Sequence, residues 1–312
     1  MRILVVGAGA TGGYFGGRLL QHGRDVTFLV REHRAAQLAR QGLQIRSAAG
    51  DTNLPAPPSV QAGELQAHYD LVLLSCKAYD LDQVMGDIAP AIGPHTAILP
   101  LLNGMRHLDR LDARFGAGCV LGGQCVIAAT LDAQGTVLHL NAAASLSFGE
   151  RDGSASARMQ AITQQLDGAG FEARQSATII QDMWDKWVFL ATLAGITCLM
   201  RAPIGDIVAA PDGTAATLAL LDECRAVAAA AGHPPGAAAM QRARDVLTEP
   251  GSSLTASMLR DLQRGHRIEA EQVIGDMLAR AAAPADERGM LALVLTHLQA
   301  YEAGRARQPR SA

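Results

Sequence analysis

A glycine-rich turn directly after the first apolar run constrains this chain more than any other feature. The run Ile3–Val6 predicts a strand, and Gly7-Ala8-Gly9-Ala10-Thr11-Gly12 follows it and leads into a predicted helix. In such a unit the first glycine makes the tight turn, the second lets the backbone approach a pyrophosphate, and the third lets helix and strand pack closely. The helix N-terminus adds N–H groups and a partial positive charge. We therefore expect residues 7–12 to bind a dinucleotide; a glycine-rich turn without a ligand is the alternative.

Short apolar runs alternate with longer helical segments through the first half of the chain. This alternation predicts a parallel sheet with crossover helices. The runs are Ile3–Val6, Val26–Val30, Leu71–Ser75, Ala97–Leu101 and Val120–Leu121. Two further runs, Thr136–Leu140 and Ser145–Gly149, predict a hairpin, and a last extended piece is expected at Phe171–Ala173. The predicted fold is α/β: an N-terminal Rossmann-type doubly wound sheet over residues 1–176, followed by an all-α domain over 177–312.

The second half of the chain is predicted to be helical. From about Gln181 the sequence is rich in Ala, Leu, Met and Arg, and prolines divide it into separate helices. These prolines are Pro203, Pro211, Pro234, Pro235 and Pro250. The apolar stretch Val188–Met200 has about 13 residues, short of the roughly 20 that a membrane span needs, so it predicts a buried helix. The tail from about Gly304 is polar and cationic, and we expect it to fray.

Composition excludes several classes of partner. The chain is 49% hydrophobic and 18% charged with a net charge of −3, so it predicts a globular protein without the basic field that nucleic acid attracts. The N-terminus begins a strand at once and shows no secretory cleavage site, and the five cysteines show no CxxC spacing. We expect a soluble cytoplasmic protein with reduced, buried thiols and no membrane partner. Its Ala-rich helices offer a face for a homodimer, although packing within one chain explains them equally well.

The end of the second predicted strand bears on the choice of cofactor. NAD-binding folds of this type usually place an acidic residue there, which accepts hydrogen bonds from the ribose 2′-hydroxyl. This chain has Arg31 instead, with Arg34 one turn further on. A guanidinium can fork onto a 2′-phosphate, so we expect NADP rather than NAD. A solvated surface charge is the alternative for Arg31, and the neighbouring Glu32 could serve a ribose if Arg31 pointed away.

Several short motifs, in order along the chain, resemble those of the ketopantoate reductases (2-dehydropantoate 2-reductases). The matching pieces are Gly7–Gly12, Arg31, Ser75-Cys76-Lys77, Leu102-Asn103-Gly104, Trp184-Asp185-Lys186-Trp187, and Ser257-Met258-Leu259-Arg260-Asp261 with Glu269. The resemblance covers nearly the whole chain, and the order and spacing of the pieces are more specific than any one motif. It implies an NADPH-dependent reductase of a 2-oxo acid whose helical domain completes the active site.

The resemblance also implies roles for individual residues. Lys77 and Asn103 would lie at strand ends facing the nicotinamide half of the cofactor, and Asn103 would also reach substrate. Asn103-Gly104 by itself predicts an ordinary turn, and a turn at a strand end is compatible with a site. Ser257 would bind substrate, and Glu269 would contact cofactor ribose or substrate and help position a catalytic lysine. Glu269 lies about two to three helical turns beyond Ser257 and Asp261, near the same helix face if the helix runs through Gly265. The alternative for Glu269 is a solvated acidic face paired with nearby arginines.

Lys186 is the candidate proton donor and a candidate substrate contact. Reduction of a 2-oxo acid needs a hydride to the carbonyl carbon, a proton to its oxygen and a cation for the carboxylate. An apolar setting next to Trp184 and Trp187 can adapt a lysine to donate a proton at neutral pH, and its ammonium stabilises the developing alkoxide. A lysine extending from an amphipathic helix into solvent is the alternative.

The chain departs from the family where substrate recognition is expected. Ketopantoate reductases typically have Asn four and eight residues after the lysine and again before a Gly-acidic pair, whereas this chain has Leu190, Ala194 and Ile204. Loss of polar partners can alter selectivity by orders of magnitude. Three hypotheses follow: reduction of 2-dehydropantoate, reduction of a more apolar 2-oxo acid, and a non-catalytic NADP-binding regulator. Metal chemistry is not expected, because the nine histidines show no HxH or HExxH spacing.

Overall fold

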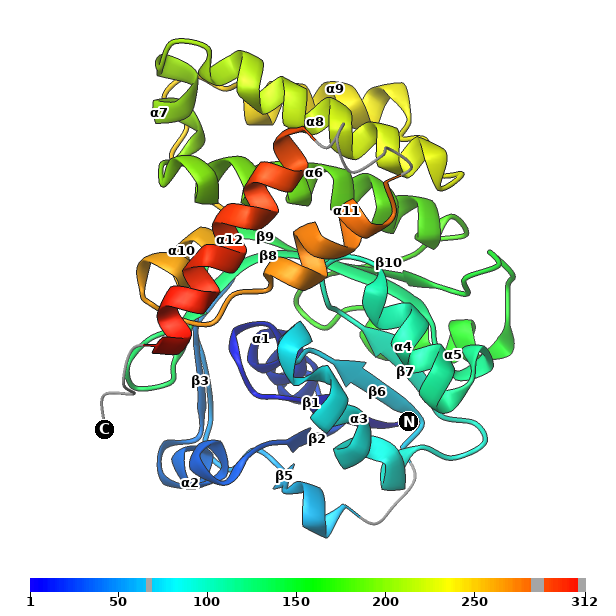
Figure 1. The fold of residues 1–312 in the computed structure, drawn as a ribbon. Coiled ribbons are helices and arrows are strands. Elements are labelled where there is room, and N and C mark those ends of the chain that lie inside the picture. The colour runs from blue at the N-terminus through cyan, green and yellow to red at the C-terminus, as the bar shows by residue number, and fades with distance from the viewer. Residues whose placement is uncertain (66–68, 282–288, 308–312) are drawn as a thin grey trace. The chain divides into compact units, whose positions relative to one another are not determined.

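The computed structural model describes residues 1–65, 69–281 and 289–307, and the chain forms two compact units (Figure 1). The first contains Met1–Leu102 and His107–Ile180. The second contains Asn103–Arg106 and the chain from Gln181 onward. The short segment at Asn103 thus packs with the helical unit, although it follows a strand of the first unit.

The first unit is built on a five-stranded parallel sheet in the order β5-β2-β1-β6-β7. Its strands are β1 (Arg2–Val6), β2 (Asp25–Leu29), β5 (Ser59–Val60), β6 (Leu71–Leu74) and β7 (Ala97–Pro100). Every residue of β6 and β7 is buried, as expected for strands covered on both faces. Helices α1 (Ala10–Gln21), α2 (Glu32–Gln41), α3 (Leu81–Ile88) and α4 (Arg106–Phe115) follow β1, β2, β6 and β7. The predicted parallel sheet is confirmed.

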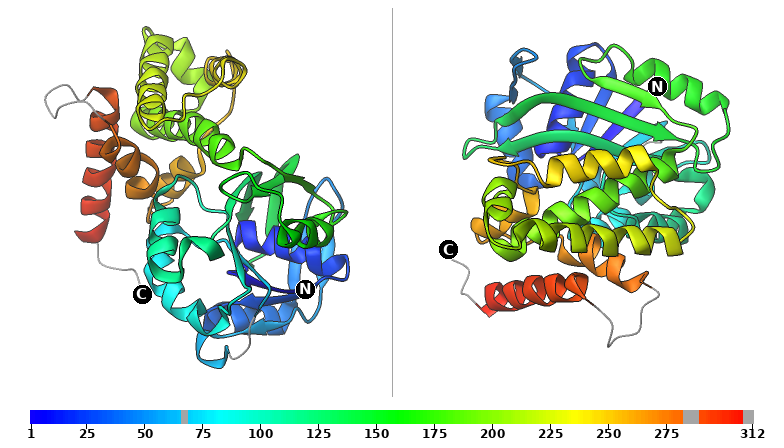
Figure 2. Two further views of the ribbon diagram at one scale, coloured as in Figure 1. Left: turned by 90° about the vertical axis from the view of Figure 1, so that its right-hand side faces the viewer. Right: turned by 90° about the horizontal axis from the view of Figure 1, so that it is seen from above.

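A second, mixed sheet completes the first unit and corrects the predicted hairpin. Its path is β10-β9-β3-β4, and β8 also pairs with β9. The bounds are β3 (Leu43–Arg46), β4 (Thr52–Leu54), β8 (Gly122–Leu131), β9 (Val137–Gly149) and β10 (Glu172–Gln175). Residues 136–140 and 145–149 were expected to form two strands, but 137–149 is one continuous strand antiparallel to β8 (Figure 2). The turn lies earlier, where the Asp132 carboxylate accepts from the backbone N–H groups of Gln134 and Thr136.

Helix α1 packs against strands of both sheets, and glycines make this possible. A Cβ at Gly16 would lie 2.6 Å from the Phe28 ring in β2, and one at Gly17 would lie 2.8 Å from Ile45 in β3. The helix therefore approaches each sheet more closely than a side chain would permit. The glycine-rich turn lies at the N-terminus of this closely packed helix.

The second unit is helical in all its described elements. They are α6 (Ile179–Met200, which begins at the end of the first unit), α7 (Ile204–Ala209), α8 (Gly213–Ala230), α9 (Ala237–Leu247), α10 (Ser257–Gln263), a π-helical turn (Glu271–Gly275), α11 (Asp276–Ala279) and α12 (Met290–Arg307). The five prolines expected to separate helices all lie between helices. Helix α6 is long and apolar enough to span a membrane, but 67% of its most apolar window is buried. It therefore serves as the core helix of this unit, as predicted for Val188–Met200.

Three smaller expectations need correction. Helix α12 continues through Arg307, so residues 304–307 are helical rather than frayed, and 308–312 lie outside the described residues. Val120 forms only an isolated bridge to Ile98. All five cysteines are free, as expected, but only Cys125, Cys198 and Cys224 are fully buried. Cys76 and Cys119 are half-buried, because each lies in a connection after a strand or helix.

Candidate active site

The glycine-rich turn has the geometry that a pyrophosphate needs. Gly7 has a φ of +91°, and its N–H donates to Leu29 O at 2.9 Å, which ties the turn to the end of β2. A Cβ at Gly12 would lie 2.1 Å from Gly7 O, so only glycine fits there. Gly9 caps α1 without a side-chain hydrogen bond, and a Cβ on Gly9 would meet nothing within 4 Å. The turn is therefore open on the side where the helix presents its N–H groups, and it fits a dinucleotide phosphate.

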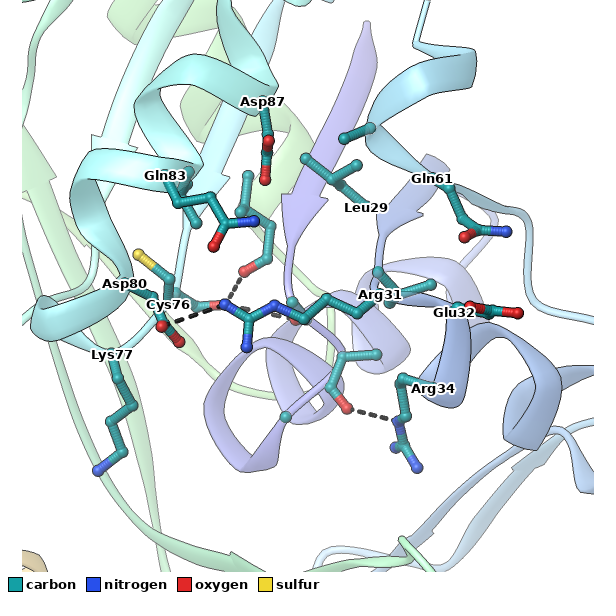
Figure 3. A pocket seen from close by; sticks show the side chains of 18 of the residues that line it. Leu29, Arg31, Glu32, Arg34, Gln61, Cys76, Lys77, Asp80, Gln83 and Asp87 are labelled. Carbon is teal, nitrogen blue, oxygen red and sulfur yellow. Dashed lines mark hydrogen bonds and ion pairs between the residues drawn. The ribbon is translucent and has the colours of Figure 1, made fainter. Parts of the chain in front are cut away.

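A cavity of about 590 Å³ opens beside this turn, within the first unit (Figure 3). It is bounded by the carboxyl ends of β1, β2 and β6 and by the segments that follow them. The lining includes Gly7, Ala8, Gly9, Arg31, Glu32, Arg34, Gln61, Ser75, Cys76, Lys77, Asp80, Gln83 and Asp87. Arg31 and Lys77, both expected to contact cofactor, thus line the same cavity as the turn. Ligands of open parallel sheets bind at this end of the strands.

Two arginines from the start of α2 reach this cavity in different ways. Arg31 extends across it, and its Nη2 lies 3.1 Å from Asp80 Oδ1 (Figure 3). Arg34 instead donates from Nε to Ala8 O in the glycine-rich turn at 3.0 Å, and its buried Nη2 has no hydrogen-bond partner among the described residues. Burial lowers the pKa of the Arg34 guanidinium, and the charge of Asp132 partly opposes that shift. Arg34 therefore fixes the turn and keeps one donor unused.

Cys76 provides a direct test of this cavity, because its thiol is half-buried and lines it. We expect NADP⁺ at about ten times its Kd to slow alkylation of Cys76 about tenfold, since only the unoccupied fraction reacts. The measurement is peptide mass spectrometry after a short iodoacetamide pulse. Cys119, half-buried and outside the cavity lining, is the internal control. Burial raises the pKa of Cys198 and of Cys224 to about 12, so both should stay unmodified. Equal slowing at Cys76 and Cys119 would contradict the assignment.

In the second unit, Lys186 and Asn103 are joined by a hydrogen bond. Lys186 Nζ donates to Asn103 Oδ1 at 3.2 Å, although the two residues are far apart in the sequence. Lys186 is half-buried on α6 between the fully buried Trp184 and Trp187. The amide oxygen of Asn103 therefore directs the ammonium group.

Gln272 holds Asn103 from the other side, and the sequence reasoning missed it. Its Nε2 donates to the backbone oxygen of Asn103 at 2.8 Å, and its side chain is almost fully buried. Gln272 lies in the π-helical turn, a rare geometry that is frequent at functional sites. Trp187 Nε1 donates to Val273 O at 2.9 Å in the same turn. The π-helical turn thus holds Asn103 through Gln272, and it holds Trp187, the neighbour of Lys186, through Val273.

Ser257 and Glu269 lie on separate elements, contrary to one expectation. They were expected near one helix face if the helix ran through Gly265, but α10 ends at Gln263 and Gly265 has a φ of +72°. His266 N donates to Asp261 O at 2.9 Å, which closes a helix C-terminal cap. Ser257 is the exposed first residue of α10, and Glu269 begins the turn in which Val273 N donates to its backbone oxygen. The helix therefore ends between them.

The three positions that depart from the family pattern are apolar in the structure as well. Leu190 is half-buried on α6, Ala194 is buried on the same helix, and Ile204 is fully buried at the start of α7. None of their side chains can form a hydrogen bond with a substrate hydroxyl. At these three positions the helical unit therefore offers apolar contacts where the family usually offers amide groups.

Asp185, beside Lys186, is expected to destabilise the native state at neutral pH. Burial raises its pKa, and the hydrogen bond from Gln181 Nε2 at 2.8 Å opposes the shift. A raised folded-state pKa favours folding below the unfolded-state value, and this contribution is lost as the pH rises through the folded-state pKa. Asp185→Asn should therefore increase the free energy of unfolding at pH 7 by about 0.5 kcal/mol or less after solvent screening, and not at low pH. Urea unfolding at both pH values measures this.

The exposed pair Gln241–Asp245 provides a matched control, with the same spacing and the same 2.8 Å hydrogen bond. Asp245→Asn should leave the free energy of unfolding nearly unchanged at both pH values. An equal gain in both variants would show that burial of Asp185 is not the cause.

A compositional signal would have strengthened the choice of Lys77 and Lys186. These are the only two lysines in the chain, and every other basic side chain apart from histidine is arginine. Arginine carries charge and forks onto anions, but it stays protonated in proteins. In a chain that otherwise uses arginine, a lysine indicates a position where an ammonium group has a specific role. The described residues contain no group of three metal-ligating side chains.

The parallel sheet, its open glycine-rich turn and the cavity beside it are typical of a nicotinamide-dependent oxidoreductase. The family model for ketopantoate reductase PanE/ApbA matches residues 3–153, and the model of its C-terminal part matches 178–302. The chain belongs to the ketopantoate reductase family.

Relatives and solved structures support this family. The chain is 38% identical over 303 residues to an uncharacterised oxidoreductase, YkpB, of Bacillus subtilis, covering 97% of this chain and 99% of that protein. It is 28% identical to a 2-dehydropantoate 2-reductase of Mesorhizobium japonicum, covering 88% and 89%. The structure of 2-dehydropantoate 2-reductase from Geobacter metallireducens is similar, with a TM-score of 0.86, 27% identity, and coverage of 96% and 99%. D-mandelate dehydrogenase with NADH and anilino(oxo)acetate shares the fold, with a TM-score of 0.86, 21% identity, and coverage of 98% and 100%.

Proposed function

We propose that this protein is an NADPH-dependent reductase of a small 2-oxo acid, with 2-dehydropantoate as the first candidate substrate and pantoate as its product. The observation that carries the proposal is the hydrogen bond from Lys186 to Asn103 in a chain with only two lysines. Such a reaction would place the protein in pantothenate biosynthesis, leading to coenzyme A, in the cytoplasm.

The first unit would bind the cofactor. Backbone N–H groups of residues 7–12 would hold the pyrophosphate, because the turn is open at Gly9. Arg31 would fork onto the 2′-phosphate, and Lys77 and Asn103 would contact the nicotinamide half. NADPH, when bound, supplies a hydride to the carbonyl carbon of the substrate.

The second unit would supply the proton. Lys186 would donate a proton from Nζ to the carbonyl oxygen as the hydride arrives, which yields the 2-hydroxy acid and leaves a neutral amine that regains a proton from water. Its ammonium group would stabilise negative charge on that oxygen before transfer. Asn103 directs Nζ, Glu269 would help to position it, and Ser257 would bind substrate.

Reduction of a more apolar 2-oxo acid is the second candidate, and Leu190, Ala194 and Ile204 favour it. The name of the 38% identical relative gives no substrate. The test is kcat/KM for 2-dehydropantoate against branched 2-oxo acids that lack its hydroxyl. A preference for 2-dehydropantoate would support the first candidate. It would also show that the reaction does not need the three asparagines that the family usually has at the positions of Leu190, Ala194 and Ile204. A preference of about tenfold or more for the apolar acids would establish the second candidate.

A further inference from the structure

The Arg31–Asp80 pair spans the central strand of the parallel sheet. Arg31 follows β2 and Asp80 follows β6, and these strands flank β1 on either side. The two side chains meet at 3.1 Å beside the glycine-rich turn that follows β1 (Figure 3). The pair therefore lies inside the cavity assigned to the cofactor, with the Arg31 side chain 66% exposed and Asp80 28% exposed.

The Asp80 carboxylate is unfavourable in a site that binds only a 2′-phosphate. A phosphate monoester carries about −1.5 to −2 charges at neutral pH, and it would compete with Asp80 for the same guanidinium. Asp80 would also repel the phosphate directly. A ribose 2′-hydroxyl, in contrast, is a donor that a carboxylate accepts, as the acidic residue of NAD-binding folds does. Glu32 and Asp87, which line the same cavity, add further negative charge.

We propose that Asp80 is a specificity-determining residue that competes with the 2′-phosphate for Arg31 and lowers the preference for NADP over NAD. Arg31 then binds the 2′-phosphate of NADP, and Asp80 accepts a hydrogen bond from the ribose 2′-hydroxyl of NAD. This inference rests on the proposed function only for the assignment of the cavity to the cofactor.

The test is calorimetric titration of NADP⁺ and NAD⁺, without substrate, into wild type and Asp80→Asn. Loss of the competing carboxylate should tighten NADP⁺ about fivefold without tightening NAD⁺, so the ratio of the two Kd values shifts toward NADP⁺. Asp82→Asn is the matched control, since Asp82 is 77% exposed on α3, pairs with Arg110 and does not line the cavity. It should leave the ratio within about twofold of wild type.

The Arg31→Gln background tests the mechanism. In that background, Asp80→Asn should change the ratio of the NADP⁺ and NAD⁺ Kd values less than it does in wild type. The reason is that Asp80 and the 2′-phosphate no longer compete for the Arg31 guanidinium. An unchanged ratio in Asp80→Asn, with melting temperature as in wild type, would overturn the inference and leave the proposed function standing. Failure of both nucleotides to bind wild type would overturn the cofactor assignment and, with it, the proposed function.

Discussion

Lys186→Met is expected to lower kcat for 2-oxo acid reduction by about 10²- to 10⁴-fold, the usual contribution of a positioned general acid. Methionine has nearly the volume of lysine and can lie between the two tryptophans, so the helical unit should stay folded. It cannot protonate the carbonyl oxygen or stabilise charge on it. The measurement is steady-state kinetics with saturating NADPH, together with the Kd for NADPH, which should stay close to that of wild type.

Lys186→Arg separates charge from proton donation. The guanidinium keeps a positive charge beside the substrate, so KM should lie closer to the wild-type value than the KM of Lys186→Met does. It stays protonated and cannot donate the proton, so kcat should stay well below the wild-type value and exceed that of Lys186→Met only by the contribution of charge stabilisation. Wild-type kcat in either variant would exclude Lys186 as the proton donor. The Asn103 contact would then be a structural tie.

Gly9→Ala and Gly12→Ala should both impair cofactor binding but differ in stability. A Cβ at Gly9 meets no protein atom within 4 Å, so this variant should melt as wild type does, yet its methyl group would occupy the path of the pyrophosphate. A Cβ at Gly12 would lie 2.1 Å from Gly7 O, so backbone must move. We expect NADP⁺ binding about tenfold or more weaker in each, and about 1–3 kcal/mol lost in stability only for Gly12→Ala.

Calorimetric titration and thermal unfolding test both glycine variants. Gly23→Ala does not serve as a control, because Gly23 has a φ of +74°. Gly86→Ala does, because Gly86 lies in α3 and a Cβ there would also meet nothing within 4 Å. Normal NADP⁺ affinity in Gly9→Ala would show that the pyrophosphate does not approach this turn.

The parallel sheet could be predicted because strands buried on both faces appear as short, continuous apolar runs. β9 could not be read in this way, since its middle residues Asn141–Ala143 are small and exposed and resemble a turn. Its true turn was signalled by Asp132 and Gly135, which cap the β8–β9 connection. The helix break before Glu269 was also readable, because Gly265 is typical of a helix C-terminus.

The site could be predicted only where one segment carries it. The glycine-rich turn is local, so residues 7–12 could be recognised from spacing alone. Asp80 and Arg31 are far apart in the sequence. They meet because they follow β6 and β2, the two strands that flank β1 in the sheet. Gln272 reaches Asn103 across 169 residues of sequence. No periodicity or spacing encodes such contacts, since they depend on the tertiary fold.

The central claim is that this chain transfers a hydride from NADPH to a 2-oxo acid. The most direct measurement follows the loss of NADPH absorbance with purified protein and a panel of 2-oxo acids that includes 2-dehydropantoate, and identifies the product by chiral chromatography. The account predicts one 2-hydroxy acid formed for each NADPH oxidised, with a single enantiomer. NADPH binding without oxidation by any acid of the panel would contradict it and would favour a non-catalytic NADP-binding regulator.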